Sequence, residues 1–209
     1  LVPLGAAAHG PALFAFPPGT GDALGYLQLA GQLPCRCFGF NFIEAPSRLQ
    51  DYADLVVRTD PEGPYLLLGY SAGGNLACAV AHELERRGRR VAGLIMIDST
   101  RKLQQTPLPD GEIERITRDF LEDASLRGYF SSPVLREKAR RLIRKSMQHA
   151  ADSVDHHIVD CDIHVLTSEH PTTEYRDPTG TLLVSLQAWA QLTRGQLRIH
   201  PGVGDHNHM

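Results

Sequence analysis

A short apolar run that stops at a Gly-x-Ser-x-Gly motif constrains this chain more than any other feature. Residues 65–68 have strand character, the motif covers residues 69–73 with Ser71 at its centre, and a helical apolar pattern resumes at Leu76. A sharp strand-to-helix turn holds its central residue in a strained conformation, so its neighbours must be small. The pattern predicts a nucleophilic Ser71 exposed at the end of a strand. The alternative is a glycine-rich turn with a passive serine.

Two backbone amides near this turn are candidates for binding an oxyanion. The helix after Ser71 would point its unpaired N–H groups and positive dipole end at negative charge that develops there. The loop 17–21 follows a strand expected at 12–16 and has the sequence Pro-Pro-Gly-Thr-Gly. Because Pro17 and Pro18 have no N–H, a donor from this loop would be the amide of Gly19 or a neighbour. A simple turn is the alternative for this loop.

The rest of the chain alternates between strand and helix patterns, which predicts an α/β domain with a mostly parallel sheet. Ser47 and Gly88 are the expected caps of two helices. Strands are expected at 12–16, 35–42, 65–70, 91–97, 162–168 and 196–200, and helices at 22–33, after Ser47 up to 59, from Ser71 to 88, and at 182–192.

Asp98 and His206 complete a candidate catalytic set with Ser71. Asp98 directly follows the buried strand 91–97, and catalytic groups gather at the carboxyl ends of parallel strands. His206 lies in a glycine-rich loop after the last strand, where α/β-hydrolases keep their general base, in the chain order Ser, acid, His. His208 is the alternative base. A metal pair of His206 and His208 has no carboxylate or cysteine cluster to support it, so no metal site is expected.

Strand patterns cease between residues 101 and 159, where two or three amphipathic helices are expected. One of them begins at Ser132 and Pro133, which form a cap and first-turn pair, and it carries many arginines and lysines. We interpret this segment as a lid inserted into a core of about 1–100 and 160–209. Its basic face is interpreted as a solvated surface, and a docking surface for an acidic partner is the alternative.

Composition limits the classes of partner and the cellular environment. A net charge of −3 gives no nucleic-acid footprint, and no apolar run approaches the roughly 20 residues of a membrane span. The four cysteines have no zinc-ligand spacing, and three of them, Cys35, Cys37 and Cys78, lie in or beside apolar runs. We therefore expect free thiols and a cytoplasmic protein without nucleic-acid or membrane partners.

Five stretches together resemble the terminal (type I) thioesterase domains of nonribosomal peptide and depsipeptide synthetases, most closely the surfactin and valinomycin type. The stretches are residues 13–18, 40–44, 48–54, 69–73 and 97–99, and the resemblance covers nearly the whole chain outside the lid. It implies an α/β-hydrolase fold, in which helices flank the sheet and a helical lid follows the Asp98 strand. It also implies that Ser71, Asp98 and His206 are nucleophile, acid and base, and that the amides of Ala72 and Gly19 are the oxyanion donors.

The resemblance further implies a function. A peptidyl or depsipeptidyl chain on the phosphopantetheine arm of an upstream carrier domain would be transferred to Ser71. It would then be released by macrocyclisation, with or without prior oligomerisation, or by hydrolysis. No bound cofactor is expected, and the domain is expected to be a monomer.

Three alternatives to this function stay open at this point. A stand-alone editing thioesterase would carry its acid after the later strand, where Glu169 is the rival to Asp98. A simple serine esterase would use the same residues on a free ester. A noncatalytic binding module usually lacks one member of the set. Members of the family continue past the histidine into a closing helix, which we expect to be missing from this chain, since it ends at Met209.

Overall fold

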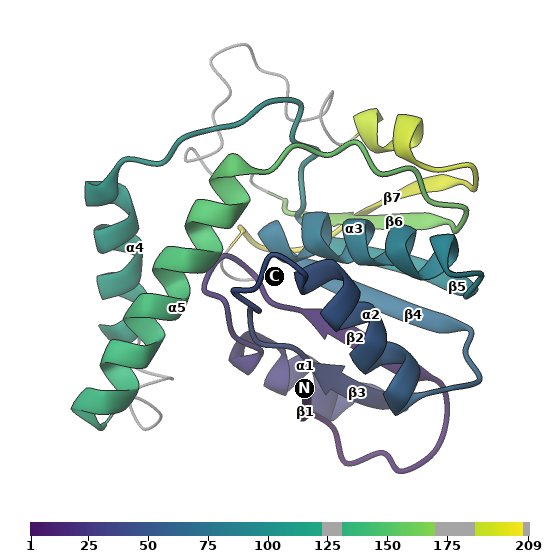
Figure 1. Ribbon diagram of the computed structural model, residues 1–209, viewed down its shortest axis with the longest axis horizontal. Coiled ribbons are helices and arrows are strands. Elements are labelled where there is room, and N and C mark those ends of the chain that lie inside the picture. The colour runs from purple at the N-terminus through teal and green to yellow at the C-terminus, as the bar shows by residue number, and fades with distance from the viewer. Residues whose placement is uncertain (123–130, 170–186, 207–209) are drawn as a thin grey trace.

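A computed structural model describes residues 1–122, 131–169 and 187–206 of the chain. Within these residues the strands form one seven-stranded sheet in the order β1-β3-β2-β4-β5-β6-β7. Strand β1 runs antiparallel to β3, and all other neighbours are parallel. Helices α2 and α3 cover one face of the sheet and α1 lies on the other (Figure 1). This architecture confirms the predicted mostly parallel sheet flanked by helices.

The predicted elements agree with the structure to within a few residues, with two differences. The two-residue strand β1 was not predicted, and the helix expected at 182–192 is a 3-10 helix over its last five residues, while residues 182–186 lie outside the described ranges. The strands are β1 (Val2–Pro3), β2 (Ala12–Phe16), β3 (Arg36–Gly39), β4 (Tyr65–Tyr70), β5 (Val91–Ile97), β6 (Ile163–Thr167) and β7 (Leu197–Pro201). The helices are α1 (Leu27–Gln32), α2 (Arg48–Thr59), α3 (Ala72–Arg86), α4 (Asp110–Glu122) and α5 (Pro133–Asp152), with 3-10 helices η1 (Leu24–Tyr26) and η3 (Ala188–Leu192).

The predicted helix ends lie at the expected residues, but the two predicted serine N-caps do not make the expected capping hydrogen bond. Gly88 follows α3 with φ +72°, the left-handed conformation that ends many helices. Ser47 and Ser132 occupy the N-cap positions of α2 and α5 without making a side-chain capping bond. The Ser47 hydroxyl instead donates to the Asp51 carboxylate at 2.9 Å, because its ψ of 9° departs from the extended backbone that N-capping requires. Pro133 is the first residue of α5, as expected.

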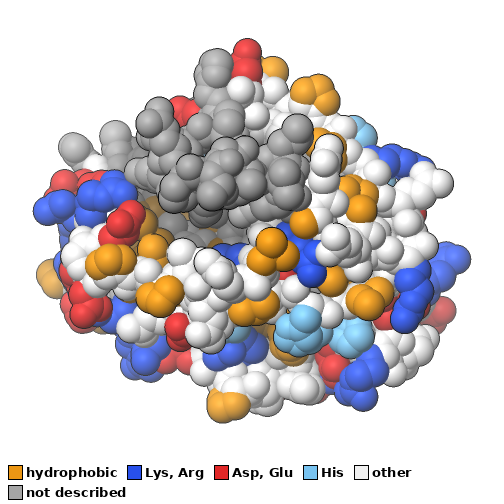
Figure 2. Space-filling model, turned by 90° about the horizontal axis from the view of Figure 1, so that it is seen from above, with side chains coloured by type: hydrophobic (Ala, Val, Ile, Leu, Met, Phe, Trp, Pro, Cys, Tyr) orange, Lys and Arg blue, Asp and Glu red, His pale blue; other side chains and the backbone are white. Residues whose placement is uncertain are grey.

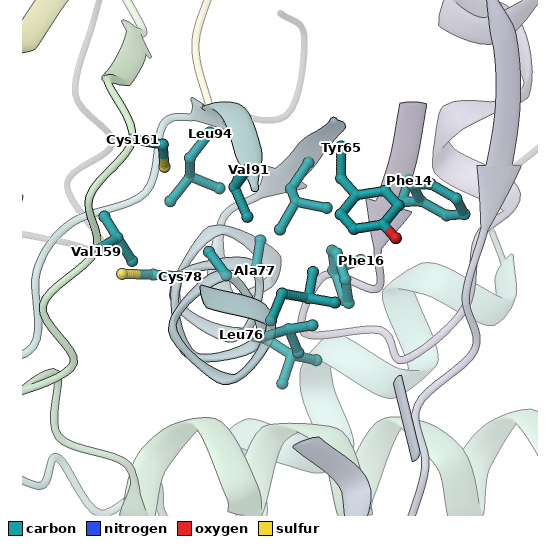
Figure 3. Close-up of a cluster of buried hydrophobic side chains, with 14 of the residues drawn as sticks. Phe14, Phe16, Tyr65, Leu76, Ala77, Cys78, Val91, Leu94, Val159 and Cys161 are labelled. Carbon is teal, nitrogen blue, oxygen red and sulfur yellow. The ribbon is translucent and has the colours of Figure 1, made fainter. Parts of the chain in front are cut away.

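The larger hydrophobic core lies between the sheet and the helices α2 and α3 (Figure 3). Phe14 and Phe16 of β2 meet the ring of Phe40, with centroids 6.3 and 5.0 Å away. Helix α3 turns small, fully buried residues such as Ala77 and Ala81 toward the sheet. These let the helix pack closely against β4 and β5, which fixes the position of its first turn. A smaller core lies on the opposite face, under α1.

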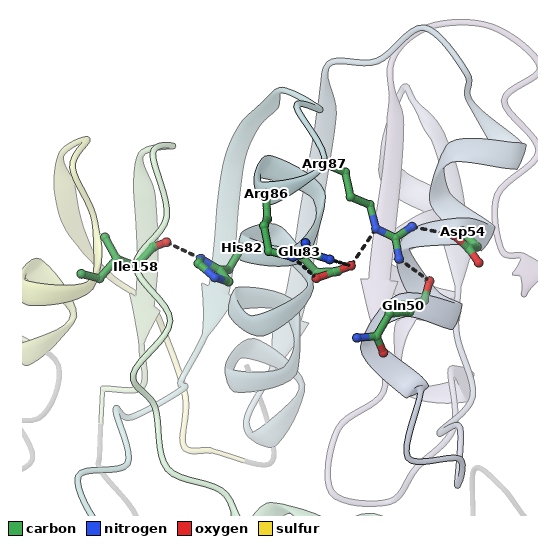
Figure 4. Close-up of polar contacts among 7 residues, drawn as sticks. All are labelled: Gln50, Asp54, His82, Glu83, Arg86, Arg87 and Ile158. Atoms are coloured by element: carbon green, nitrogen blue, oxygen red, sulfur yellow. Dashed lines mark hydrogen bonds and ion pairs between the residues drawn. The ribbon is translucent and has the colours of Figure 1, made fainter.

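Charged side chains fasten the far end of α3 to its neighbours (Figure 4). The buried carboxylate of Glu83 accepts hydrogen bonds from Arg86 and Arg87, and Arg87 also contacts Asp54 of α2 at 2.5 Å. The bonds from Arg86 and Arg87 lower the pKa of Glu83 although burial acts in the other direction. On the opposite side, the His82 ring donates to a carbonyl of the segment that follows α5. This end of helix α3 is therefore held from both sides, by α2 and by the segment after α5.

Helices α4 and α5 lie side by side and run in roughly opposite directions at one side of the sheet (Figure 1). Both belong to the segment 101–159 that was assigned to the lid. Arg140 and Arg144 of α5 form ion pairs with Glu114 of α4, and Arg141 pairs with Glu44 of the core. Figure 2 shows acidic and basic side chains interleaved at this end of the molecule. The basic face predicted to be solvated is thus partly engaged, although exposed pairs of this kind contribute only about 0–1 kcal/mol each.

The structure also bears on the predictions about thiols and membranes. All four cysteines are free, and the Cys35 and Cys37 sulfur atoms lie 3.5 Å apart. Across the three described ranges, no helix has both the length and the apolar surface needed to cross a membrane. The predicted lack of a closing helix after His206 is not tested, because residues 207–209 lie outside the described ranges.

Candidate active site

Ser71 stands between β4 and α3 in the strained conformation that the motif predicted, with φ 54° and ψ −127°. Its N–H donates to the carbonyl of Ile97 at the end of β5, at 2.8 Å. A Cβ on Gly69 would lie 2.2 Å from the Gly73 carbonyl carbon, and one on Gly73 would lie 2.5 Å from the Phe16 oxygen. Both motif glycines are therefore required by close backbone contacts, and the turn can be made only by this pattern of small residues.

His206 connects Ser71 to Asp98 through a continuous chain of hydrogen bonds. Its Nε2 lies 3.1 Å from the Ser71 Oγ, and its Nδ1 lies 2.6 Å from the Asp98 Oδ2. Because an ionised carboxylate only accepts, the Nδ1 carries the proton and donates to Asp98. The Nε2 is then free to accept the Ser71 proton, which is the tautomer that a general base requires. The structure brings together the three residues that the sequence singled out.

Asp98 is held as an ionised acceptor. Its Oδ1 accepts from the backbone N–H of Ser168 at 3.1 Å, and its own N–H donates to the carbonyl of Leu166 at 2.7 Å. Burial would raise the pKa of Asp98, but the hydrogen bonds from His206 and Ser168 outweigh burial and lower it. The carboxylate can thus stabilise an imidazolium as His206 takes up a proton.

The two residues named as alternatives have different outcomes. Glu169 is not the partner of His206; its backbone N–H donates to the carbonyl of Gly204 at 2.8 Å, and so connects the loops after β6 and β7. The acid position beside His206 is taken by Asp98 at the end of β5, which also binds the N–H of Ser168, the residue before Glu169. His208 lies outside the described residues.

Tyr70 and Tyr26 support the site, and sequence reasoning missed both. The Tyr70 hydroxyl donates to the backbone carbonyl of His206, and the two rings lie 4.9 Å apart between centroids. The buried Tyr26 hydroxyl donates to the Phe16 carbonyl at 2.6 Å and accepts from the Tyr70 N–H at 2.8 Å. Burial raises the pKa of Tyr26, so it stays a neutral hydroxyl that bridges the ends of β2 and β4. Tyr70 is only a variable position of the motif, and nothing in the local sequence distinguishes Tyr26.

The predicted oxyanion loop lies against the first turn of α3, of which Ala72 is the first residue. A tight turn closes this loop, since the Gly21 N–H donates to the Pro18 carbonyl at 2.8 Å and Gly21 has φ +81°. The Gly19 N–H donates to no acceptor among the described residues. An uncommitted amide at this place suits the predicted donor, although its role as a donor to substrate stays a prediction.

A cavity of about 450 Å³ opens beside the first turn of α3, between the core and α5. Pro17 and Ala72 are among its lining residues, so it reaches the predicted donor at Ala72, whereas Gly19 is not among the residues that line it. Its apolar wall comes from the core, chiefly Phe42, Leu49 and Leu76, while α5 closes the opposite side. Such a volume is typical of pockets that bind organic ligands of moderate size.

The polar side chains of the cavity are paired with one another. Arg48 donates to the Nδ1 of His149 at 3.2 Å, and burial together with Arg48 and Lys102 lowers the pKa of His149 to about 4. Asp155 accepts from the Asn75 side chain and the Lys102 N–H, both at 2.6 Å, and burial raises its pKa. These residues come from four distant segments, which is why no spacing in the sequence revealed them.

The arrangement can perform covalent acyl transfer. A serine hydroxyl next to a neutral imidazole, which a buried carboxylate orients, is an activated nucleophile, and helix-terminal amides beside it can stabilise an oxyanion. Over residues 1–122, 131–169 and 187–206, no group of three or more His, Cys, Asp or Glu is placed to hold a metal ion.

Comparisons with known proteins agree with this chemistry. The family model described as "Thioesterase domain" matches residues 11–209. The chain is 32% identical over 198 residues to surfactin synthase subunit 3 of Bacillus subtilis (strain 168), covering 94% of this chain and 15% of that protein. It is 33% identical over 172 residues to gramicidin S synthase 2 of Brevibacillus brevis, covering 75% of this chain and 4% of that protein. It therefore spans only a small part of each of these relatives.

Solved structures give the same result. The surfactin thioesterase domain SrfTE superposes with a TM-score of 0.81 at 31% identity, covering 96% of this chain and 84% of that one. The Vlm2 thioesterase domain bound with a dodecadepsipeptide superposes with a TM-score of 0.79 at 22% identity, covering 100% and 90%, a likeness of fold. The chain belongs to the thioesterase domain family and is a serine thioesterase with the α/β-hydrolase fold.

Proposed function

We propose that this domain releases a finished peptidyl or depsipeptidyl chain from the phosphopantetheine arm of an upstream carrier domain, through an acyl-Ser71 intermediate. The observation that carries the proposal is the hydrogen-bonded chain of Ser71, His206 and Asp98 next to the 450 Å³ cavity. The relatives support the choice of substrate, since they include surfactin synthase subunit 3 and gramicidin S synthase 2, and the SrfTE structure is described as the basis for cyclisation of a lipopeptide.

In the first step, the Ser71 oxygen attacks the thioester carbonyl carbon while the Nε2 of His206 takes the hydroxyl proton. The carbonyl electron pair moves onto oxygen, where the amides of Ala72 and Gly19 would stabilise the charge. Collapse of the tetrahedral intermediate breaks the C–S bond. The imidazolium returns its proton to the departing phosphopantetheine sulfur, so the products are a free thiol and an ester on Ser71.

In the second step, an amine or hydroxyl at the far end of the acyl chain, or water, attacks the Ser71 ester. His206 takes the proton of the attacking group and then returns it to the Ser71 oxygen as the ester C–O bond breaks. An internal nucleophile gives a macrocycle, and water gives a linear acid. Cyclisation requires that water be kept from the ester, which α5 can assist because it forms one wall of the cavity.

Three further features of the sequence analysis belong to this proposal. The chemistry uses only side chains and backbone amides, so the domain would need no bound cofactor. It would act as a monomer, in cis with its carrier domain. The four free cysteines support a reducing, cytoplasmic location.

Intact-protein mass spectrometry tests the proposal directly. The full chain is incubated with a peptidyl thioester mimic, in parallel with Ser71→Ala and with Ser47→Ala, a serine exposed at the start of α2. A mass gain equal to the acyl group on the parent and on Ser47→Ala, and none on Ser71→Ala, would support the acyl-Ser71 intermediate. No gain on folded parent with several acyl lengths, or an equal gain on Ser71→Ala, would refute it.

The released product separates the two outcomes of the second step. A linear acid is heavier than the corresponding macrocycle by one water, so its mass distinguishes hydrolysis from cyclisation. A fluorophosphonate that labels the parent but not Ser71→Ala would further separate a serine hydrolase from a noncatalytic binding module.

A further inference from the structure

Helix α5 rests directly on the loop that supplies the proposed Gly19 donor. Gly21 has no room for a side chain, because a Cβ there would lie 2.9 Å from the Leu142 side chain and 3.1 Å from the Ser146 Cβ. The Met147 side chain lies 3.8 Å from the corresponding position on Gly19. Leu142 and Ser146 are four residues apart and share one face of the helix, and Met147 extends this contact to Gly19. The lid helix and the oxyanion loop thus form one packed unit.

Within this contact, and among the residues that the structure describes, the Ser146 side chain makes one hydrogen bond. Its hydroxyl donates to the carbonyl oxygen of Pro18 at 3.2 Å, and the residue is 4% exposed. The same carbonyl accepts from the Gly21 N–H at 2.8 Å. Pro18 is therefore held by one donor from its own turn and one from α5. Removal of the hydroxyl would leave the Pro18 carbonyl with the Gly21 N–H as its partner in the described part of the chain.

The carbonyl that Ser146 binds belongs to the same peptide unit as the Gly19 N–H. The Pro18–Gly19 peptide bond is trans, so its C=O and N–H lie in one plane and point in opposite directions. A bond that fixes the carbonyl on the α5 side consequently fixes the direction of the N–H on the other side. This N–H donates to no acceptor in the described part of the chain, so its direction is set by the contacts of the carbonyl.

We infer that Ser146 is a positioning residue for the oxyanion hole, through which the seated helix α5 aims the Gly19 amide at the reacting carbonyl. The inference rests on the proposed function, in which that amide is an oxyanion donor. It makes the position of α5 part of the chemical step, since a lid that lifts away removes one of the two donors that orient the Pro18–Gly19 peptide.

The test compares Ser146→Ala with the full parent chain in single-turnover acylation by a thioester mimic. Loss of a whole oxyanion donor costs roughly 100- to 1000-fold in rate. Because the Gly21 N–H still holds the Pro18 carbonyl, we expect a smaller loss, on the order of 10-fold in the acylation rate with KM unchanged. Alanine is a stronger helix former than serine, so α5 should be retained.

A boronic acid that forms a tetrahedral adduct on Ser71 provides the readout that a merely structural role would not move. Its oxygen occupies the oxyanion hole, so Ser146→Ala should raise its Ki by the same factor of about 10 as it lowers the acylation rate. Ser146→Cys keeps a weak donor and should lie between parent and alanine in both measurements. Thr117→Val is the matched control: it removes another buried lid hydroxyl, which donates to the Ile113 carbonyl of its own helix α4, and should leave both values unchanged.

The outcomes separate this inference from the proposed function. An inactive but folded parent would refute the proposed function itself. An active parent with Ser146→Ala at parental rate would overturn the inference alone. A slower Ser146→Ala with unchanged boronate affinity, or Ser146→Cys no better than alanine, would also overturn it.

Discussion

Replacing Asp98 with asparagine exchanges one acceptor oxygen for an NH₂ group in a place where both oxygens are engaged. In the parent, one oxygen accepts from the Ser168 N–H at 3.1 Å and the other from the His206 Nδ1–H at 2.6 Å. Asparagine has one oxygen for these two donors. If that oxygen stays with Ser168, its NH₂ faces the Nδ1 of His206, which must then accept, and the imidazole proton moves to Nε2.

That tautomer cannot act on Ser71, because a protonated Nε2 faces the hydroxyl whose proton it should take. The opposite amide orientation preserves the imidazole but sets NH₂ against the Ser168 N–H, leaving a buried donor unpaired at about 1–3 kcal/mol. The inactive arrangement is therefore favoured. Removal of the carboxylate charge also takes away its stabilisation of the imidazolium. We expect the acylation rate of Asp98→Asn to fall about 10⁴-fold, or about 5.5 kcal/mol, as in other triads of this geometry.

Single-turnover acylation with a thioester mimic, followed by rapid acid quench and mass spectrometry, measures this rate without the release step. Glu169→Gln is the matched control, since it makes the same chemical change on the rival acid. Its backbone N–H donates to the Gly204 carbonyl at 2.8 Å, and its carboxylate accepts from the Gly204 N–H at 3.5 Å, an acceptor that glutamine retains. We expect Glu169→Gln to stay within about 2-fold of the parent, because the side chain is exposed and the substitution leaves the backbone bond in place.

Two results would refute the reasoning. If Asp98→Asn kept more than about a tenth of the parental acylation rate, the hydrogen bond to His206 would not control the tautomer. If Glu169→Gln lost more activity than Asp98→Asn, the acid would be Glu169 and the alternative branch of the family would apply. Melting temperatures of both variants show whether a loss of activity reflects a loss of fold.

Two further predictions concern stability. Gly74→Ala would place a Cβ 2.2 Å from the Ser99 Oγ and 2.6 Å from its Cβ, so the free energy of unfolding, measured with denaturant, should fall by about 2–3 kcal/mol. Gly25→Ala is the control, because a Cβ there would have no atom within 4 Å. Equal stabilities of the two variants would contradict the predicted clash at Gly74. Burial raises the pKa of Asp22 from 3.8 to about 6, so the parent should lose stability as pH rises from about 4 to about 6. Asp22→Asn keeps the acceptor for the Leu24 N–H and should be more stable than the parent at pH 8, by up to about 3 kcal/mol. The stabilities of the variant and the parent should converge below pH 4. A constant difference between them across this pH range would disprove that Asp22 ionisation destabilises the fold.

Sequence reasoning succeeded where a local pattern has a single structural solution. Gly69 and Gly73 flank Ser71 where the backbone passes close to itself, since a Cβ added at either would lie 2.2 or 2.5 Å from a backbone atom. Asp98 was found because a buried strand of seven residues ends one residue before it. His206 was found from chain order and its glycine-rich loop. Each of these signals lies within about ten residues of the functional group.

Sequence reasoning failed where function depends on contacts between segments that lie far apart in the chain. Tyr26 bridges β2 and β4 across 44 residues, and Ser146 binds Pro18 across 128. Neither residue type is unusual in a helix, so no local signal exists. The ion pairs of the basic face of α5 were missed for the same reason: the acidic partner Glu114 lies 26 residues before Arg140 in the sequence and was not recognised as lying opposite to it.

The order of the strands explains why the histidine loop needs its own supports. Ser71 and Asp98 follow the neighbouring strands β4 and β5, and both have positive φ. The sheet ladder continues one residue past each strand, through Ser71 N–H to the Ile97 carbonyl and Asp98 N–H to the Leu166 carbonyl. These two hydrogen bonds hold Ser71 and Asp98 in backbone conformations that each cost about 1–3 kcal/mol of folding free energy.

His206, by contrast, follows β7, three strand positions from β4, a distance of roughly 14 Å at the usual spacing. Its loop must therefore reach back across the end of β6 to bring the Nε2 within 3.1 Å of Ser71. Two contacts make this possible: the Glu169 N–H holds the Gly204 carbonyl near the start of the return, and the Tyr70 hydroxyl holds the carbonyl of His206 at its end. The nucleophile and acid are thus placed by the sheet itself, whereas the base is placed by hydrogen bonds that reach it from β4 and from the loop after β6.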